Sequence, residues 1–308
     1  MFLNRFFVIV ICGGVFAVAC FKLIFINVFC MFSSNCVIVT PAPEISLKSS
    51  PVRAFMLNRL RKNMNLNLLH FGVVHENFVD LASRVIISSK SPESVLSSLK
   101  NCFGIKYFSL AQRIYFDSLD DLCAKAVNVA KGVLESGTFA VRGKSFTKGI
   151  SSKQLEEGIG HHLLDKYPKL KVKLKGCEHE FHCLISKNTA YFYFSYLSGA
   201  EGMPTGSQGC VGLLVLPGSK KSDLISIGKN LLKFGCNVSL ISDSPSESID
   251  ELVEFNNFKP LKVFSIAQAK KLYSSGDLTA FFSDSKTPNA AILVSEIVGV
   301  KVFAPLLV

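Results

Sequence analysis

The side chains whose types and spacing point most directly to chemistry are basic, and they gather in the middle of the chain. Arg142, Lys144 and Lys148 lie in a glycine-containing stretch, residues 142–150, which we expect to be a loop, and Lys153 follows at the start of an expected helix. Such a loop offers backbone N–H donors, the positive end of a helix dipole and cations to a phosphate group. A solvated charged surface is the alternative that residue types alone leave open.

A second basic group lies just downstream. Residues 169–175 alternate lysine with apolar residues, which predicts a half-buried strand with one lysine-lined face. Positions 136–176 hold nine basic and three acidic residues, a net charge of +6, whereas positions 242–285 hold four basic and seven acidic residues, a net charge of −3. The positive potential therefore belongs to the middle of the chain, where a polyanion such as nucleic acid would bind.

The turn after an expected strand at 211–216 is a candidate phosphate-binding loop. Residues 217–223 read Pro-Gly-Ser-Lys-Lys-Ser-Asp and lead into a helix, which is where nucleotides bind in α/β folds. The spacing is neither G-x-x-x-x-G-K-[ST] nor G-x-G-x-x-G. Gly218, Ser219 and Ser222 are the residues that would contact a phosphate, and an ordinary strand-to-helix turn is the alternative.

Two further patterns favour structure over chemistry. The segment 177–183 contains two cysteines and two histidines, but a tetrahedral zinc ion rarely takes four ligands from seven residues, and His182 and Cys183 would point to opposite faces of a strand. Residues 191–194, Tyr-Phe-Tyr-Phe, could stack nucleic-acid bases, yet such a run is more often strand core. The ten cysteines include no C-x-x-C pair, so we expect reduced thiols and assign neither a metal site nor a catalytic residue.

The elements that must position these residues follow from composition and periodicity. The chain has 308 residues, which favours about two domains, and its 49% hydrophobic content excludes wholesale disorder. A net charge of +11 points to polyanionic partners. Strands and helices alternate regularly after residue 209, which predicts a parallel sheet covered by helices. Asn63, Asn65 and Asn67 weaken the C-terminal half of a helix expected at 51–69.

The remaining expected elements can be given by range. Strands are expected at 36–40, 84–88, from 103, 138–142, 180–186, 190–197, 237–242, 261–265, 278–283 and 300–303. Helices are expected at 92–101, from Leu119 to near Gly137, between Ser151 and Pro168, and at 222–234, 247–255, 266–274 and 287–298. Ser151 and Gln154 have the spacing of a capping box at the start of the third of these helices.

The N-terminal segment is a separate question. Residues 6–21 carry no charge, and the apolar run resumes after Lys22. About twenty apolar residues can cross a bilayer as a helix, and the basic residues that follow would keep the bulk of the chain in the cytoplasm. Three interpretations stay open: translation from Met31, a membrane tether formed by residues 6–30, and a cleaved signal peptide. We expect a cytoplasmic protein, which a retained segment would tether to the membrane.

Three segments, in this order, resemble the tRNA 4-thiouridine synthetase (tRNA sulfurtransferase) family. Residues 44–48 (Glu-Ile-Ser-Leu-Lys), followed by Arg53, and residues 103–105 (Phe-Gly-Ile) are similar to the family's N-terminal ferredoxin-like domain. Residues 139–142 (Phe-Ala-Val-Arg) are similar to its THUMP domain, an RNA-binding module. Residues 202–209 (Gly-Met-Pro-Thr-Gly-Ser-Gln-Gly) closely resemble the G-x-P-x-G-[ST]-Q-G junction that leads into the family's ATP-binding domain.

This resemblance covers residues 36–209 and implies tRNA as the partner. Contacts would go mainly to phosphate and sugar, because A-form helices hide their base edges in a deep groove. The residues expected to contact RNA are Lys48, Arg53, Arg142, Lys144, Lys148, Lys153, Lys171 and Lys173.

The last hundred residues match the family less closely. Residues 217–222 stand where the family has an S-G-G-x-D-S phosphate loop; Gly218 and Ser222 match, but Lys221 replaces the acidic residue. Residues 283–289 resemble a later glycine- and serine-containing segment of the family. ATP and magnesium are therefore expected only if this divergent loop is functional, and a sulfur-donor or catalytic partner protein would then be needed.

The sequence thus predicts α+β ferredoxin-like and THUMP domains followed by a short α/β parallel-sheet domain, with an N-terminal transmembrane helix as an open alternative. The expected divisions are a hydrophobic segment at 1–32, a ferredoxin-like domain at 36–115, a THUMP domain at 116–200 and a degenerate phosphate-loop domain at 209–308. The favoured function is tRNA binding in tRNA modification. An active ATP-dependent tRNA thiolation enzyme and a membrane-tethered interaction protein are the alternatives.

Overall fold

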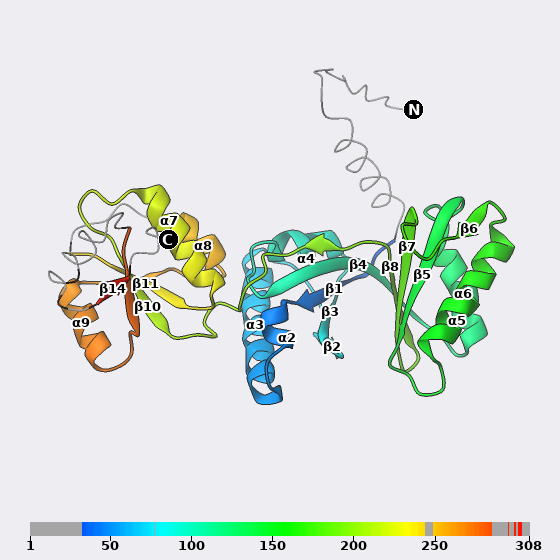
Figure 1. Cartoon of the computed structure of the whole chain (residues 1–308), viewed down its shortest axis with the longest axis horizontal. Coiled ribbons are helices and arrows are strands. Elements are labelled where there is room, and N and C mark those ends of the chain that lie inside the picture. The colour runs from blue at the N-terminus through cyan, green and yellow to red at the C-terminus, as the bar shows by residue number, and fades with distance from the viewer. Residues whose placement is uncertain are drawn as a thin grey trace, which may run out of the picture.

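Three folded units lie in a row (Figure 1). They are seen in a computed structural model that describes residues 33–76, 78–243, 249–284, 295, 299 and 301–303. The expected N-terminal apolar segment and, apart from Ser295, the expected helix at 287–298 lie outside these residues. Within the described ranges, no helix has both the length and the apolar character that a bilayer crossing requires.

The first unit is a sheet with its helices on one face. Its elements are β1 (Cys36–Pro41), α2 (Pro43–Ser46), α3 (Ser50–His70), β2 (Val79–Leu81), β3 (Arg84–Ser88), α4 (Pro92–Leu99) and β4 (Ile105–Tyr115). β1 lies between β3 and β4 and is antiparallel to both, and β2 pairs with the outer side of β3. This is the strand order of a ferredoxin-like unit. The sequence did not predict β2, because it is short and two of its three residues are exposed.

The second unit packs two helices on one face of the same sheet. Its elements are α5 (Leu119–Ala130), β5 (Gly137–Ser145), α6 (Ser152–Lys166), β6 (Leu170–Val172), β7 (His179–Ser186), β8 (Thr189–Tyr193) and β9 (Leu197–Ser198). β5 is parallel to both β6 and β7, and β7 and β8 form an antiparallel hairpin. The capping box predicted at the start of α6 is confirmed, since Ser151 and Gln154 exchange hydrogen bonds.

Strand β4 belongs to both units. Its first part pairs with β1, and its last four residues, from Gln112 to Tyr115, pair with β8. Among the described residues, nine strands therefore form one continuous sheet, with β9 alongside β4. The first and second units are joined by backbone hydrogen bonds rather than by a flexible linker.

The face of this sheet opposite the helices carries a core that spans both units. Ile38 and Ile86 of the first unit pack with Leu184, Tyr191 and Tyr193 of the second. The interpretation of residues 191–194 as strand core is thus confirmed for Tyr191, Phe192 and Tyr193, which are all buried.

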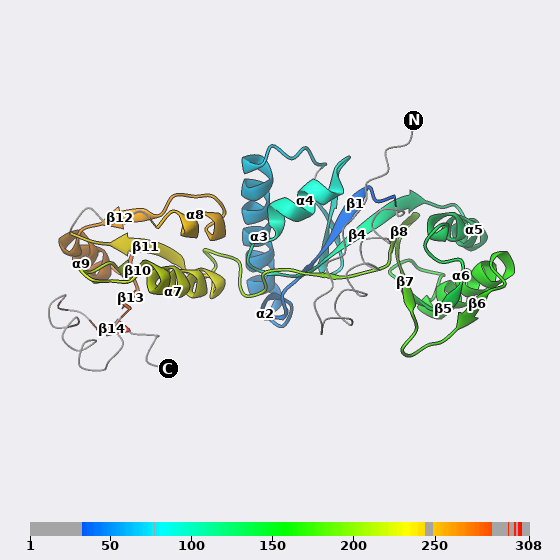
Figure 2. The same cartoon turned by 90° about the horizontal axis from the view of Figure 1, so that it is seen from above.

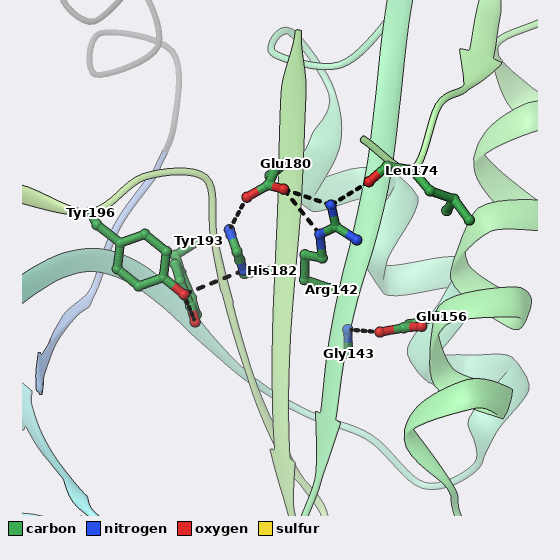
Figure 3. Close-up of polar contacts among 8 residues, drawn as sticks. All are labelled: Arg142, Gly143, Glu156, Leu174, Glu180, His182, Tyr193 and Tyr196. Atoms are coloured by element: carbon green, nitrogen blue, oxygen red, sulfur yellow. Dashed lines mark hydrogen bonds and ion pairs between the residues drawn. The ribbon is translucent and has the colours of Figure 1, made fainter. Parts of the chain in front are cut away.

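His182 extends this core toward Tyr196 (Figure 3). Its ring stacks on Tyr193 with 4.7 Å between centroids, and its Nε2 lies 3.5 Å from a carboxylate oxygen of Glu180. The neighbouring Cys183 points to the other face and is buried against the helices, as the strand alternation predicted.

The third unit is a parallel sheet between helices, as the sequence predicted. Its elements are β10 (Cys210–Leu214), α7 (Lys221–Lys233), β11 (Asn237–Ile241), α8 (Glu251–Phe255), β12 (Lys262–Phe264), α9 (Ile266–Ser274), β13 (Ala280–Phe282) and β14 (Val302–Phe303). The five strands seen in the described residues have the order β12-β11-β10-β13-β14. α7 and α8 cover one face of this sheet and α9 the other. After β10 the chain adds β11 and β12 on one side of it and then β13 and β14 on the other, so the strand order reverses between β10 and β13. Ligands bind at such reversal points in folds of this kind.

The junction between the first and third units depends on close backbone approach. Gly202 has φ +74°, and a Cβ there would lie 2.4 Å from the carbonyl oxygen of Lys233 at the end of α7. The backbone N–H of Met203 donates to that same carbonyl at 2.8 Å. A side chain at position 202 would therefore push the connector away from α7.

Polar side chains of α3 complete this junction. Asn63 donates to the carbonyl of Thr205, and Asn67 donates to the side-chain oxygen of Asn257 at 2.8 Å. The ring of Phe258 stacks on His70 with 3.8 Å between centroids. The helix predicted to weaken at its asparagines continues to His70, and the amide N–H groups of both Asn63 and Asn67 have tertiary acceptors there.

Two sequence expectations in the second unit were wrong in extent. The loop expected at 142–150 begins only after Ser145, because β5 pairs with β7 up to that residue. The strand expected at 169–175 is limited to β6, and Val172 and Leu174 are 54% and 65% exposed rather than half-buried. Leu170 packs into the core, and the rest of the lysine-rich segment lies on the surface at the edge of the sheet.

The burial of His182 makes the folding stability of the protein depend on pH. Burial lowers the pKa of His182 to about 4, from an ordinary value of 6.5. The unfolded chain therefore binds more protons between these two values, and folding stability falls as the pH falls through this window. We expect the wild-type protein to lose about 1 kcal/mol more than His182→Gln between about pH 7.5 and about pH 5.5. Urea denaturation of both proteins at each pH measures this difference, and parallel losses would contradict it.

Candidate nucleic-acid interface

One face of the second unit gathers three of the predicted basic residues. Phe139 and Val141 of β5 point into the core beneath α5 and α6, so the alternate residues Arg142 and Lys144 point to the other face. Lys171 pairs in register with Thr138 of β5 and shares that face. Lys173, like Lys144 and Lys171, is exposed, and its backbone N–H donates to the carbonyl of Phe139.

Arg142 has a different environment from these lysines (Figure 3). Its Nη2 donates to Glu180 at 2.7 Å and to the carbonyl oxygen of Leu174 at 2.6 Å, and its Nε donates to Glu180 at 3.0 Å. The hydrogen bonds that Arg142 donates to the Glu180 carboxylate raise the pKa of Arg142 above its ordinary value. The guanidinium therefore fastens the lysine-rich segment after β6 to strands β5 and β7.

Two further lysines, Lys148 and Lys153, follow the carboxyl end of β5. Lys148 is exposed in the turn before α6, and Lys144 lies with its Nζ 5.4 Å from the ring centroid of Phe146. Lys153, in the first turn of α6, is 3.7 Å from Glu157, but at 82% exposure such a pair contributes little. Close approach of α6 to β5 needs Gly143, because a Cβ there would meet Glu156 and Leu155 at about 3 Å.

The two basic residues predicted in the first unit lie elsewhere. Lys48 follows α2 and is exposed, and Arg53 in the first turn of α3 donates to Ser50 and to the carbonyl of Ser46. Both views place α2 and α3 toward the third unit, whereas β5, β6 and α6 lie at the opposite end of the molecule (Figures 1 and 2). The structure thus brings six of the eight predicted residues to the second unit and separates two from them.

The loop predicted to bind phosphate is held by an acidic side chain. The hydroxyl of Ser219 donates to Oδ1 of Asp284 at 3.0 Å, and the backbone N–H of Lys220 donates to Oδ2 at 3.1 Å. Gly218 forms the turn with φ +87°, and Ser222 is exposed in the first turn of α7. Three residues proposed as phosphate contacts do lie at the carboxyl end of β10, but the donors of this loop already bind a carboxylate.

The sequence analysis did not identify the acidic side chains that bind Arg142 and Ser219. Glu180 lies 38 positions from Arg142, and Asp284 lies 65 positions from Ser219. No local periodicity connects such residues; only the strand order brings them together. Within the part of the chain that the structure describes, no group of three or more histidine, cysteine or acidic side chains could hold a metal ion.

Comparison with known proteins identifies the second unit. A family model for the THUMP domain matches residues 116–195. Probable tRNA sulfurtransferases are similar to the chain: that of Streptococcus sanguinis is 27% identical over 201 residues, and that of Bacillus subtilis 30% over 206 residues. Each match covers 64% of this chain, and 48% and 49% of the respective relatives. The chain therefore spans about half the length of these curated relatives.

Two solved structures share the whole described architecture. A protein of Pyrococcus horikoshii superimposes with a TM-score of 0.72 at 21% identity, covering 88% of this chain and 94% of that protein. A 4-thiouridine synthetase, solved as an RNA complex with bound ATP, superimposes with a TM-score of 0.68 at 20% identity, covering 89% and 81%. At these identities the likeness shows a common fold. The chain therefore contains a THUMP domain and is similar to probable tRNA sulfurtransferases over about 200 residues.

Proposed function

We propose that the chain binds structured RNA, with tRNA as its partner, and acts in tRNA modification in the cytoplasm by holding the tRNA. The observation that carries this proposal is a THUMP domain whose exposed lysines share one face. Lys144, Lys171 and Lys173 form no ion pair within the described residues, so their charges remain available to phosphates.

The geometry supports contacts to the RNA backbone rather than to base edges. Lysine ammonium groups are point charges that bind phosphate without reading sequence. A-form RNA presents its phosphates and 2′-hydroxyls on the surface and hides its major-groove edges. Lys148 and Lys153, near the N-terminus of α6, would extend the contact along the backbone, and Lys48 and Arg53 would meet an RNA long enough to reach the first unit.

The lysine face makes a prediction about affinity and salt. The triple variant Lys144→Ala, Lys171→Ala, Lys173→Ala should bind tRNA more weakly, because each lost phosphate contact reduces the slope of log K against log salt by about 1. Filter binding across a range of salt concentrations measures both quantities. The control, Lys259→Ala, Lys262→Ala, Lys271→Ala, removes the same charge from exposed lysines of the third unit. Equal effects of the two triples would reject the proposed face.

Arg142 should act on RNA binding through the segment that it holds. Arg142→Gln removes the guanidinium that holds the carbonyl of Leu174, and Glu180→Gln breaks the ion pair that orients this guanidinium, so each should weaken tRNA binding. Because Glu180 acts on the segment through Arg142, the double variant should bind no more weakly than Arg142→Gln alone. Tighter binding by Glu180→Gln would instead mean that Arg142 contacts phosphate directly and that Glu180 competes for it.

ATP-dependent thiolation of tRNA is the alternative function, and it would require ATP, magnesium and a sulfur-donor partner. A parallel sheet whose loop 217–222 lies at the reversal of winding favours it. The residues in this loop do not fit the phosphates of ATP, however, because Ser219 and Lys220 donate to Asp284 and Lys221 pairs with Glu251. RNA binding therefore ranks ahead of thiolation.

A direct assay separates these two functions. The chain incubated with ATP, magnesium, tRNA and a persulfide donor should give no thiouridine, measured by nucleoside chromatography and mass spectrometry, while it retains tRNA binding. A full-length tRNA sulfurtransferase serves as the positive control for the donor system. Thiouridine formed by the chain itself would establish the enzymatic alternative.

A further inference from the structure

The loop at the carboxyl end of β10 has the features of an anion site, and its anion belongs to the chain. The thirteen-residue helix α7 begins at Lys221, and no side chain of its N-cap residue, Lys220, caps it. Instead, the Lys220 N–H donates to Asp284, which follows β13 and is 64 positions away. A carboxylate at this end of a helix is stabilised by the helix dipole and by the free N–H groups, as a phosphate would be.

Both oxygens of the Asp284 carboxylate are used. Oδ1 accepts from the Ser219 hydroxyl, and Oδ2 accepts from the Lys220 backbone. Ser219 is itself fixed, since its Oγ accepts from the N–H of Leu216 at 3.1 Å and its N–H donates to the Leu216 carbonyl at 3.0 Å. Contacts with Asp284 and Leu216 thus fix the positions of Ser219 and Lys220 in the loop.

An ion pair also engages the adjacent cation, Lys221. The Nζ of Lys221 lies 3.0 Å from Glu251 of α8, so its charge is directed away from the loop and partly neutralised. An incoming phosphate would have to displace one carboxylate, and would meet the charges of both before doing so. The Ser219 hydroxyl, the Lys220 N–H and the Lys221 ammonium group are all engaged with acidic groups of the same unit.

We propose that Asp284 is a built-in counter-anion that closes loop 217–222 to the phosphates of ATP, so that the third unit is a closed oxyanion site which opens to pyrophosphate only when this carboxylate is removed. The ligand class follows from the donors, which would bind phosphate oxygens as they bind the carboxylate. This inference concerns the third unit alone and stands independently of RNA binding by the second.

The test compares the full-length wild-type chain with Asp284→Ala and Asp284→Asn. Thermal melting and calorimetric titration are carried out with inorganic pyrophosphate and with ATP, each at up to about 1 mM and without added metal. Wild-type protein should show neither binding nor a change in melting temperature. Asp284→Ala should melt at a lower temperature than wild type, and pyrophosphate should raise that temperature with concentration, because a ligand that binds only the folded state stabilises it.

The other variants distinguish charge from geometry. Asp284→Asn retains an acceptor oxygen without the charge, so it should lose less stability than the alanine variant and still respond to pyrophosphate. Asp250→Ala removes an exposed acidic side chain of the same unit and should not create a response. All three variants should bind tRNA as the wild type does, so failure of the RNA-binding proposal would be seen separately.

Two results would overturn the inference. Binding of ATP or pyrophosphate by the wild-type chain, with a Kd below about 1 mM, would show that Asp284 does not close the loop. An Asp284→Asn variant that is folded, melts with the wild type and does not respond to pyrophosphate would show that the carboxylate occupies no anion site. The asparagine variant keeps the question answerable if the alanine variant fails to fold.

Discussion

The strand β4 is the constraint on which the arrangement of the first and second units depends. It pairs with β1 along its first part and with β8 along its last four residues, so one strand fixes the register of two units. Because a shift by one residue would exchange the two faces, Phe108 could enter the first core and Ala111 the shared core only in the observed register. The lysine face of the second unit therefore has a fixed position relative to the first unit, and one rigid surface can meet a folded RNA without an ordering cost for the two units.

Acidic partners, rather than the number of basic residues, decide which cations are available to a ligand. Arg142 and Lys144 lie two residues apart on the same face of β5, yet the first is neutralised by Glu180 and the second extends over Phe146. The Arg142 guanidinium donates two hydrogen bonds to one oxygen of Glu180, which fixes its geometry as well as its charge. The net charge of +11 belongs to the whole chain. It overstates the positive charge that a polyanion would meet at the third unit, where Lys221 pairs with Glu251. It is a better guide to the charge at the second unit.

The parts of the fold that depend on local signals could be predicted from the sequence. The capping box of Ser151 and Gln154 marked the start of α6, and the regular alternation after residue 209 indicated the parallel sheet. The parts that depend on distant partners could not. The lysine alternation after Leu170 read as a strand, but its pairing with β5 ends at Val172 and Arg142 takes the carbonyl of Leu174 instead. The asparagines of α3 read as a weakness, but their partners Thr205 and Asn257 belong to segments 142 and 190 positions away.

The same chemistry has opposite outcomes at the two ends of the molecule. At the second unit, Lys144, Lys171 and Lys173 form no ion pair within the described residues, so an external phosphate would have no acidic side chain to displace there. At the third unit, the N-terminus of α7 and its serine bind Asp284, which is present at a high effective concentration because it belongs to the same chain. An external anion at that site must therefore compete with a tethered one, whereas at the lysine face it competes only with dissolved counterions. On the proposed RNA-binding function, this difference would direct phosphate binding to the THUMP end of the chain.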